Sequence, residues 1–299
     1  MICGIRVSGK KGQGFKRDPL ENRHVELLFI NQIIGEVPEN IIFKKTMQDR
    51  DVLIIAHRGE SFDAPENTLS AINLAWRRNV DAVEIDIRLS KDDKIVVIHD
   101  EDTMRYGGTS QKVSRQTLEE LKKIDVGAYR GEAWRHETIP TLDEVLDTIP
   151  KGKHLFVEIK CGTEVISPLK QLFSNRSSLY KSVIFIGLDL ETMRAVKKGC
   201  PRHDAYWVCE LEEFTNPGNW SPALEALIAK TKKAGLDGVD VFACDAVNPW
   251  FIQKVHSAEM RLYVWTVNEA EEAKRLRDAG VDGITTDRAM WLKGILTSL

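Results

Sequence analysis

The sequence predicts an α/β fold, a (β/α)8 TIM barrel with a small insertion after the second strand. From residue 51 onward, short strand-like apolar runs alternate with helical stretches eight times, which is typical of parallel strands joined by right-handed crossovers. One phrase recurs at three helix-to-strand junctions, in 79–86, 235–242 and 280–287, with Asn or Gly where a left-handed helix cap is expected. Eight units over about 245 residues favour a closed barrel over an open sheet.

The elements follow from local patterns in chain order. The run LIIAH at 53–57 predicts the first strand, and Pro-Glu-Asn-Thr begins a helix that ends near Arg78. Residues 81–90 predict the second strand, which a KDDK turn joins to IVVIHD as a hairpin. Residues 101–138 are rich in Gly, Thr and Arg and form the predicted insertion. Further strands are expected at 154–159, 182–187, 204–209, 237–241, 261–266 and 281–285, and helices at 141–149, 163–174, 189–198, 222–234, 248–258, 269–279 and 288–298.

Composition excludes several classes of protein. The chain has 299 residues, 42% of them apolar and 29% charged, with a net charge of −3, so a generally basic nucleic-acid binder is excluded. No apolar run approaches the roughly 20 residues of a membrane span. The sequence has no G-x-G-x-x-G or G-x-x-x-x-G-K-[ST] nucleotide motif. Five scattered cysteines without C-x-x-C spacing argue against a disulfide scaffold or a zinc–cysteine site.

The N-terminal region differs from the rest. Residues 1–48 are predicted to be a loosely ordered extension, and 49–299 the barrel; the alternative is a short helix at 25–34 that docks on the barrel or on a second subunit. The segment is a poor secretory signal because charged residues, not small ones, follow its apolar run. With the unpaired cysteines, this predicts a cytoplasmic location. Oligomeric state is not predicted.

Carboxylates occupy inward positions of the predicted barrel. Because alternate residues of a strand face opposite sides, Glu84 and Asp86 point inward from the second strand while its valine and isoleucines face the helices. Glu158 and Lys160 point inward from the third barrel strand. All lie toward the carboxyl ends of their strands, where barrel enzymes build active sites. The remaining candidates at this rim are His57, Arg58 and, at the hairpin tip, His99 and Asp100.

These residue types predict a metal site. Three carboxylates do not stay ionised in a partly buried mouth without a compensating cation, and oxygen ligands alone suit Mg²⁺ or Ca²⁺. The alternative is structural ion pairing with Arg88 and Lys160, but the convergence of two histidines and an arginine favours a site. A divalent cation, three carboxylates, Arg58 and Lys160 leave a charge of +1, which matches a phosphodiester. The two histidines can then divide the roles of base and acid.

The motifs resemble the glycerophosphodiester phosphodiesterase family. They are HRGESFDAPENT, EIDIRLSKDDKIVVIHD, IPTLDEVL, VEIK, WTVN and GVDGITTDR, in the family's order from about residue 51 to the C-terminus. The resemblance implies metal-dependent hydrolysis of glycerophosphodiesters to glycerol 3-phosphate and an alcohol. It implies the metal ligands Glu84, Asp86 and Glu158, the acid/base pair His57 and His99, and the phosphate-holding Arg58 and Lys160. In the family's scheme the glycerol 2-hydroxyl attacks phosphorus, and water then opens a cyclic phosphate.

Four matched residues have less specific expectations. Trp265 shares the inward parity of Tyr263 and either walls the substrate pocket or packs in the core. Glu66 and Asn67 follow a proline at a helix start, where capping is expected, although Glu66 is near enough to assist the metal shell. Asp287 is expected to cap the last helix, with ligand contact as the alternative.

Two other functions stay open from the residues. A lysophospholipase D-type enzyme would use the same fold and metal on lysophospholipids, but the polar insertion favours small soluble diesters. A binding protein that has lost turnover would lack a ligand or a histidine, and neither is missing. The leaving alcohol, the choice between Mg²⁺ and Ca²⁺, and the base of the first step are left open.

Overall fold

A computed structural model describes residues 52–107, 110–213 and 220–297. The predicted extension 1–48 and its boundary with the barrel lie outside these residues. The barrel strands are β1 (Leu53–Ala56), β2 (Ala82–Leu89), β4 (His154–Ile159), β5 (Val183–Gly187), β6 (Ala205–Cys209), β9 (Gly238–Phe242), β10 (Arg261–Trp265) and β11 (Gly283–Thr286). Each lies within two residues of its predicted range.

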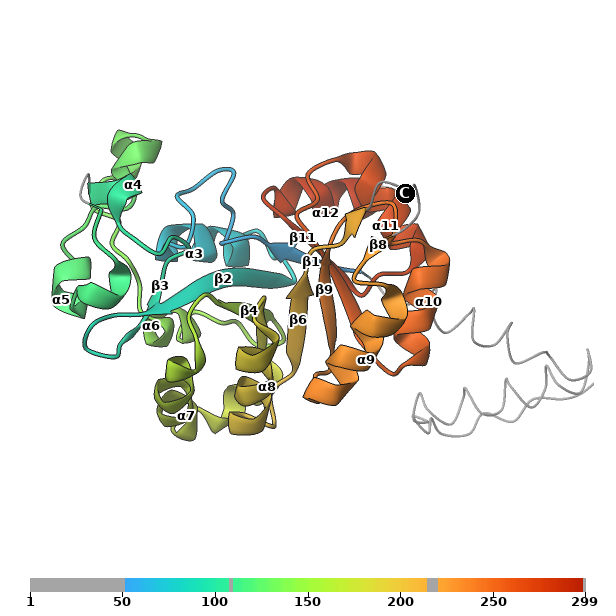
Figure 1. The fold of residues 1–299 in the computed structure, drawn as a ribbon. Helices are drawn as coiled ribbons and strands as arrows, with labels where there is room; N and C mark the ends of the chain where they lie inside the picture. Colours follow the sequence, from blue (N-terminus) through green and yellow to red (C-terminus); the bar gives the residue numbers. More distant parts are fainter. Residues whose placement is uncertain (1–51, 108–109, 214–219, 298–299) are drawn as a thin grey trace, which may run out of the picture. The chain divides into compact units, whose positions relative to one another are not determined.

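The parallel strands form a closed barrel. Hydrogen bonding runs in the order β1-β11-β10-β9-β6-β5-β4-β2, and a β1–β2 pairing closes the ring (Figure 1). β3 (Ile95–Val97) pairs antiparallel with β2 and confirms the predicted hairpin. β7 (Glu212–Glu213) and β8 (Trp220–Ser221) form a small separate pair that the sequence patterns do not predict. The prediction of a (β/α)8 barrel is therefore confirmed.

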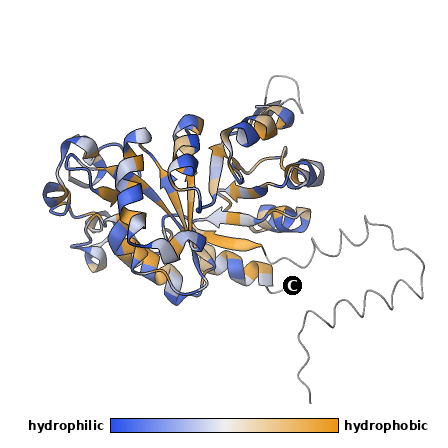
Figure 2. Cartoon of the chain, turned by 90° about the horizontal axis from the view of Figure 1, so that it is seen from below, coloured by the Kyte–Doolittle hydropathy of each residue, from blue (hydrophilic) through white to orange (hydrophobic). Residues whose placement is uncertain are grey.

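Helices surround this ring (Figure 2). They are α3 (Leu69–Arg77), α6 (Leu142–Leu146), α7 (Ile166–Ser174), α8 (Leu190–Gly199), α9 (Leu224–Ala234), α10 (Pro249–Ser257), α11 (Ala270–Ala279) and α12 (Ala289–Thr297). The helix predicted from residue 163 begins as a 3₁₀ turn over Thr163–Val165. Most of these helices place an apolar stripe against the strands, because their buried residues recur at helical spacing.

The three recurring junctions work as predicted. Asn79, Gly235 and Gly280 all have positive φ, at 58°, 73° and 99°, the conformation that ends a helix and starts the turn into a strand. The aspartate two residues further on then accepts a hydrogen bond from a backbone N–H of a neighbouring strand or its edge. Asp237 bonds Ala205 N at 2.8 Å, and Asp282 bonds Leu262 N at 2.9 Å. These carboxylates tie adjacent strands together at the amino-terminal end of the barrel.

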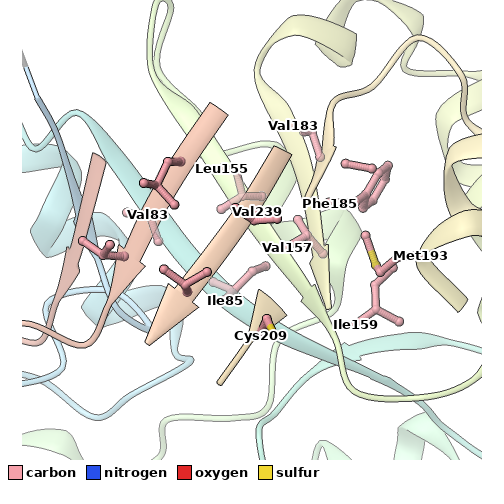
Figure 3. Packing of buried hydrophobic residues seen from close by; sticks show 14 of the residues in the cluster. Val83, Ile85, Leu155, Val157, Ile159, Val183, Phe185, Met193, Cys209 and Val239 are labelled. Carbon is pink, nitrogen blue, oxygen red and sulfur yellow. The ribbon is translucent and has the colours of Figure 1, made fainter. Parts of the chain in front are cut away.

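The barrel has two apolar cores, one outside the ring of strands and one inside it. The outer core lies between strands and helices and includes Val83, Ile85 and Val157 (Figure 3). The inner core fills the barrel with side chains that include Phe156, Tyr206 and Tyr263. Their rings pack 5.0–6.4 Å apart. Because this inner core fills the interior, the charged inward residues of the same strands form a separate layer toward the carboxyl ends of the strands.

The insertion adds a small core of its own. It contains α4 (Met104–Gly107) and α5 (Leu118–Leu121), and it buries Val113, Leu121 and Val126 against the hairpin. The insertion therefore packs beside the mouth of the barrel, where Figure 1 shows α4 and α5 next to β3. None of the helices in the described ranges has both the length and the apolar character of a bilayer span. The cysteines in these ranges are unpaired, as predicted.

Candidate active site

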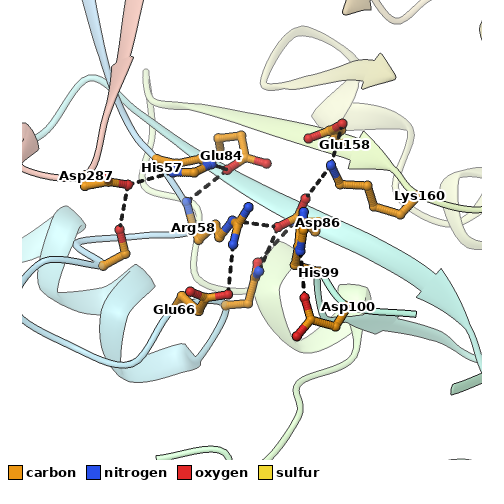
Figure 4. A network of polar contacts seen from close by, with 12 residues as sticks. His57, Arg58, Glu66, Glu84, Asp86, His99, Asp100, Glu158, Lys160 and Asp287 are labelled. Atoms are coloured by element: carbon orange, nitrogen blue, oxygen red, sulfur yellow. Dashed lines mark hydrogen bonds and ion pairs between the residues drawn. The ribbon is translucent and has the colours of Figure 1, made fainter. Parts of the chain in front are cut away.

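Two neighbouring barrel strands, β2 and β4, bring three carboxylates close together. Asp86 on β2 lies directly across from Glu158 on β4 in the parallel register, and Glu84 precedes Asp86 on the same face. Ligand oxygens of Glu84, Asp86 and Glu158 all lie within 4.8 Å of one another. His57 and Arg58 follow β1. Because β1 pairs with β2, these two residues lie beside the carboxylates (Figure 4). Lys160 follows β4 at the same level.

Gly59 explains the turn that places His57 and Arg58. Its φ is +81°, and a Cβ built on it would lie 2.6 Å from a backbone carbon of Ala71 in α3. Arg58 itself has φ of 56°. This turn aims the Arg58 backbone N–H at Glu84 Oε2, 2.9 Å away. The glycine of His-Arg-Gly is therefore required by both backbone conformation and close packing.

Two cationic side chains compensate part of the negative charge. Arg58 Nε lies 3.1 Å from Asp86 Oδ2, and Lys160 Nζ lies 2.7 Å from Glu158 Oε1 and 3.4 Å from Asp86 Oδ1. Arg88 donates instead to the backbone carbonyls of His99 and Lys160, at 2.8 and 2.9 Å. Lys160 therefore pairs with the carboxylates, whereas Arg88, the other expected pairing partner, binds backbone carbonyls.

The carboxylate cluster fits a bound cation. Glu84 Oε1 and Asp86 Oδ1 are buried and make no hydrogen bond within the described residues, and the ion pair of Asp86 Oδ1 with Lys160 is a long one of 3.4 Å. Burial, and then the charges of Asp86 and Glu158, raise the pKa of Glu84 well above its usual range. Burial and then Asp86 likewise raise the pKa of Glu158, against Lys160. Acceptor oxygens left over in an under-compensated acidic cluster are what a hard divalent ion requires.

Asp86 behaves differently from its neighbours. Burial raises its pKa, but the charges of Arg58 and Lys160 outweigh burial and lower it overall. The amide of Asn67 also donates to Asp86 Oδ2 at 2.8 Å, and its carbonyl accepts the Asp86 N–H at 3.1 Å. Asp86 is therefore held ionised in a fixed orientation at the centre of the cluster.

Both imidazoles are oriented in the same way. His57 Nδ1 lies 2.7 Å from Asp287 Oδ1, and His99 Nδ1 lies 2.8 Å from Asp100 Oδ1. A carboxylate on Nδ1 favours the proton there and leaves Nε2 available. His57 Nε2 lies 4.0 Å from Glu84 Oε2, so this ring borders the cluster. Burial lowers the pKa of His99, although Asp86 and Asp100 partly oppose the shift.

Two expectations about helix capping are wrong. Asp287 accepts hydrogen bonds from His57, Ser61 and Asn268, the last at 2.6 Å. Asn67 binds Asp86, and the cap of α3 is Thr68, whose hydroxyl accepts the Ala71 N–H. Both residues end a strand or begin a helix, so local sequence cannot distinguish a cap from a site residue.

Glu66 and Trp265 make different kinds of contact. Glu66 Oε1 accepts from Arg58 at 2.9 Å and from Arg105 of the insertion at 2.7 Å, so its contacts are with cations. Trp265 is half-buried, packs against the inner core and donates from Nε1 to the Asp240 carbonyl at 3.3 Å. Its ring lies 5.6 Å from that of the exposed Phe242. Trp265 therefore forms part of the inner core and also reaches the rim.

Comparisons with known proteins identify the family of this chain. Residues 57–290 match the Glycerophosphoryl diester phosphodiesterase family. A glycerophosphodiester phosphodiesterase of Caldanaerobacter subterraneus subsp. tengcongensis is 33% identical over 241 residues, which cover 79% of this chain and 93% of the relative. One of Bacillus subtilis is 28% identical over 252 residues, covering 79% of this chain and 83% of the relative.

Solved structures share the fold. A glycerophosphodiester phosphodiesterase of Thermotoga maritima has a TM-score of 0.65 at 27% identity, covering 82% of this chain and 99% of that one. A phosphodiesterase of Oleispira antarctica, solved with the product sn-glycerol-3-phosphate, has a TM-score of 0.73 at 24% identity, covering 82% and 96%. Fold and matches together define an enzyme that hydrolyses phosphoric diesters on an α/β barrel. The chain belongs to the glycerophosphodiester phosphodiesterase family.

Proposed function

We propose that this enzyme converts glycerophosphodiesters to sn-glycerol 3-phosphate and an alcohol, with one divalent cation and two histidines as acid and base. One observation carries the proposal. Three carboxylates lie within 4.8 Å of one another, and each of the two nearby imidazoles has a carboxylate on its Nδ1. The Oleispira antarctica relative, which binds this product, supports the choice of substrate class.

Glu84, Asp86 and Glu158 would hold the cation, Mg²⁺ or Ca²⁺. When bound, such an ion supplies positive charge to phosphoryl and hydroxyl oxygens. The residues around it would bind the phosphate. Arg58 and Lys160 lie on opposite sides of Asp86 and carry donors suited to phosphoryl oxygens. Trp265 would line the substrate pocket beside them.

The two histidines would move the protons. In the first step the glycerol 2-hydroxyl oxygen bonds to phosphorus, and one imidazole Nε2 takes its proton. The bond to the leaving alcohol breaks, and the other imidazole protonates that oxygen. Water then opens the cyclic phosphate and yields glycerol 3-phosphate. Asp287 and Asp100 keep each ring in the tautomer that these transfers need.

A turnover assay tests the proposal. Glycerophosphocholine and glycerophosphoethanolamine should release glycerol 3-phosphate with Mg²⁺ or Ca²⁺ and none with a chelator. His57→Ala and His99→Ala should each lower kcat on the order of 10²–10⁴-fold. His136→Asn is the matched control, because His136 is exposed and Asn tolerates its φ of 70°. A histidine variant with wild-type turnover removes that ring from the reaction.

Lysophospholipids are a second candidate substrate. Phe62, Met104 and Tyr129 are 55%, 61% and 47% exposed, and Met104 and Tyr129 belong to the insertion beside the mouth. The insertion is therefore less polar at its surface than its sequence suggests, and an acyl chain would find apolar contacts there. Turnover of lysophosphatidylcholine above that of glycerophosphocholine would favour this substrate. The cytoplasmic location and the absence of nucleic-acid partners stay predictions.

A further inference from the structure

Two halves of the candidate site lie on different parts of the chain. Arg58, on the turn after β1, reaches Glu66 through Nη1 at 2.9 Å. His99, on the hairpin after β3, reaches Asp100 through Nδ1 at 2.8 Å. The strands that carry the two halves, β1 and β3, are both hydrogen-bonded to β2. The strand pairings therefore place the two turns, and side-chain contacts set the orientation of the groups on them.

Arg105 of the insertion connects the two halves. Its Nη2 lies 2.7 Å from Glu66 Oε1, and its Nε lies 3.0 Å from Asp100 Oδ2. The guanidinium also lies 4.8 Å from the centre of the Tyr106 ring, which restricts where it can swing. The contacts form one chain of alternating charge: Arg58, Glu66, Arg105, Asp100 and His99. Figure 4 shows both ends of this chain.

The two carboxylates in this chain of contacts, Asp100 and Glu66, use their oxygens differently. Asp100 uses Oδ1 for His99 and Oδ2 for Arg105, so the arginine fixes the rotation of the carboxylate that orients the imidazole. Glu66 uses Oε1 for both arginines, so Arg105 also limits how strongly Glu66 can pull Arg58 away from Asp86. A planar guanidinium with several donors can bind two carboxylates at once, and an ammonium cannot do so in the same geometry.

We propose that Arg105 is a positioning residue for phosphodiester hydrolysis, which sets the orientation of His99 through Asp100 and of Arg58 through Glu66. The insertion after the second strand thereby completes the active site. This inference rests on the proposed function. The alternative is that Arg105 only fastens the insertion to the barrel, in which case its loss would change stability and leave the chemistry intact.

Kinetics of Arg105→Gln separate these outcomes. We expect kcat for glycerophosphocholine to fall about 10- to 100-fold, as for other residues that orient ligating or reacting groups. Metal affinity, measured by calorimetry with Mg²⁺ or Ca²⁺, should change little because Arg105 touches none of the three clustered carboxylates. The matched control is Arg135→Gln in the same insertion. Arg135 is exposed and pairs with Glu132 at 2.7 Å, so this variant should keep wild-type kinetics.

A triple variant, compared with the double variant of the two carboxylates, identifies the route. If Arg105 acts through Asp100 and Glu66, Arg105→Gln should add little to Asp100→Asn combined with Glu66→Gln. Arg105→Lys keeps the charge and should recover only part of the lost kcat. If Arg105→Gln does not fold, the Lys variant carries the same test. Wild-type kcat in Arg105→Gln or Arg105→Lys, or fully additive effects, would overturn the inference. An inactive wild-type enzyme would instead refute the proposed function.

Discussion

Asp287 Oδ1 lies 2.7 Å from Nδ1 of His57, although 230 residues separate the two in the chain. The contact exists because β11 pairs with β1 in register, with Thr286 across from Ala56, so that the next residues of both strands leave the barrel side by side. Ser61 and Asn268 also donate to Asp287. The carboxylate is thus fixed on three sides, and it fixes the imidazole in turn.

We predict that Asp287→Asn lowers kcat on the order of 10²–10⁴-fold with a small change in KM. The amide removes the charge behind the ring and disturbs the tautomer that leaves Nε2 free. Steady-state kinetics on glycerophosphocholine would measure the effect. Asp189→Asn is the control, because Asp189 caps α8 and Asn caps as well as Asp. Unchanged kcat in a folded Asp287→Asn protein would contradict this role.

A second prediction concerns the clustered carboxylates. Glu84 is buried beside Asp86 and Glu158, with Oε1 making no hydrogen bond in the described chain. Glu84→Gln should therefore raise Tm in the presence of chelator, because it removes like-charge repulsion. For the wild-type protein, addition of Mg²⁺ or Ca²⁺ should instead raise Tm. At a metal concentration of 100 times Kd, the free energy of unfolding should increase by about 3 kcal/mol.

Thermal unfolding with and without metal measures both effects. The Gln variant should lose most of the metal-dependent gain, since one ligand oxygen has lost its charge. Glu119→Gln provides a control, because Glu119 is exposed on α5 and pairs only with Lys123 among the described residues. An equal metal-dependent gain in wild type and Glu84→Gln would argue against a cation at this cluster.

A third prediction gives the pH dependence of stability at the other end of the barrel. Burial raises the pKa of Asp282, but hydrogen bonds from His256 and Leu262 N–H outweigh it and lower the pKa overall. Asp282→Asn should therefore lower the free energy of unfolding at pH 7 by about 1–3 kcal/mol. Because a lowered folded-state pKa stabilises above the unfolded value, the difference should shrink as pH falls below about 4.

Denaturant titrations at several pH values would test this dependence. Asp278→Asn is the matched control, since Asp278 is 66% exposed and pairs with Arg277 at the surface. That change should stay within about 0.5 kcal/mol. A stability difference for Asp282→Asn that is the same at pH 3 and pH 7 would show that the charge contributes nothing.

A fourth prediction separates two reasons for glycine at position 59. Gly59 and Gly152 both have φ of +81°, but a Cβ on Gly152 meets nothing within 4 Å. Gly152→Ala should cost about 1 kcal/mol of stability from backbone conformation alone. Gly59→Ala should cost at least about 2 kcal/mol more, because the Cβ meets α3. It should also lower activity, because the turn carries His57 and Arg58. Equal losses of stability in the two variants would show that the contact between the Cβ and α3 has no effect.

Much of this protein is predictable from local patterns. Strand runs, helix starts and the caps at Asn79, Gly235 and Gly280 are encoded within a few residues, because backbone preference and burial periodicity act over that range. The inward parity of Glu84, Asp86 and Glu158 follows from the two-residue repeat of a strand. Their meeting point follows once the strands are parallel, since carboxyl ends then share one edge.

The side-chain partners of the site residues are not predictable from local sequence. Asp287 and Asn67 have the local sequence of helix caps, and Arg105 lies in an insertion without periodicity. Each acquires its contacts only when the ring of strands closes and the insertion packs beside the hairpin. Side-chain pairing across such distances depends on the positions of whole elements to within an ångström or so, and no short stretch of chain carries that information. Local chemistry therefore specifies the barrel and its acidic cluster, whereas closure of the barrel brings Asp287 to His57 and packing of the insertion brings Arg105 to Asp100.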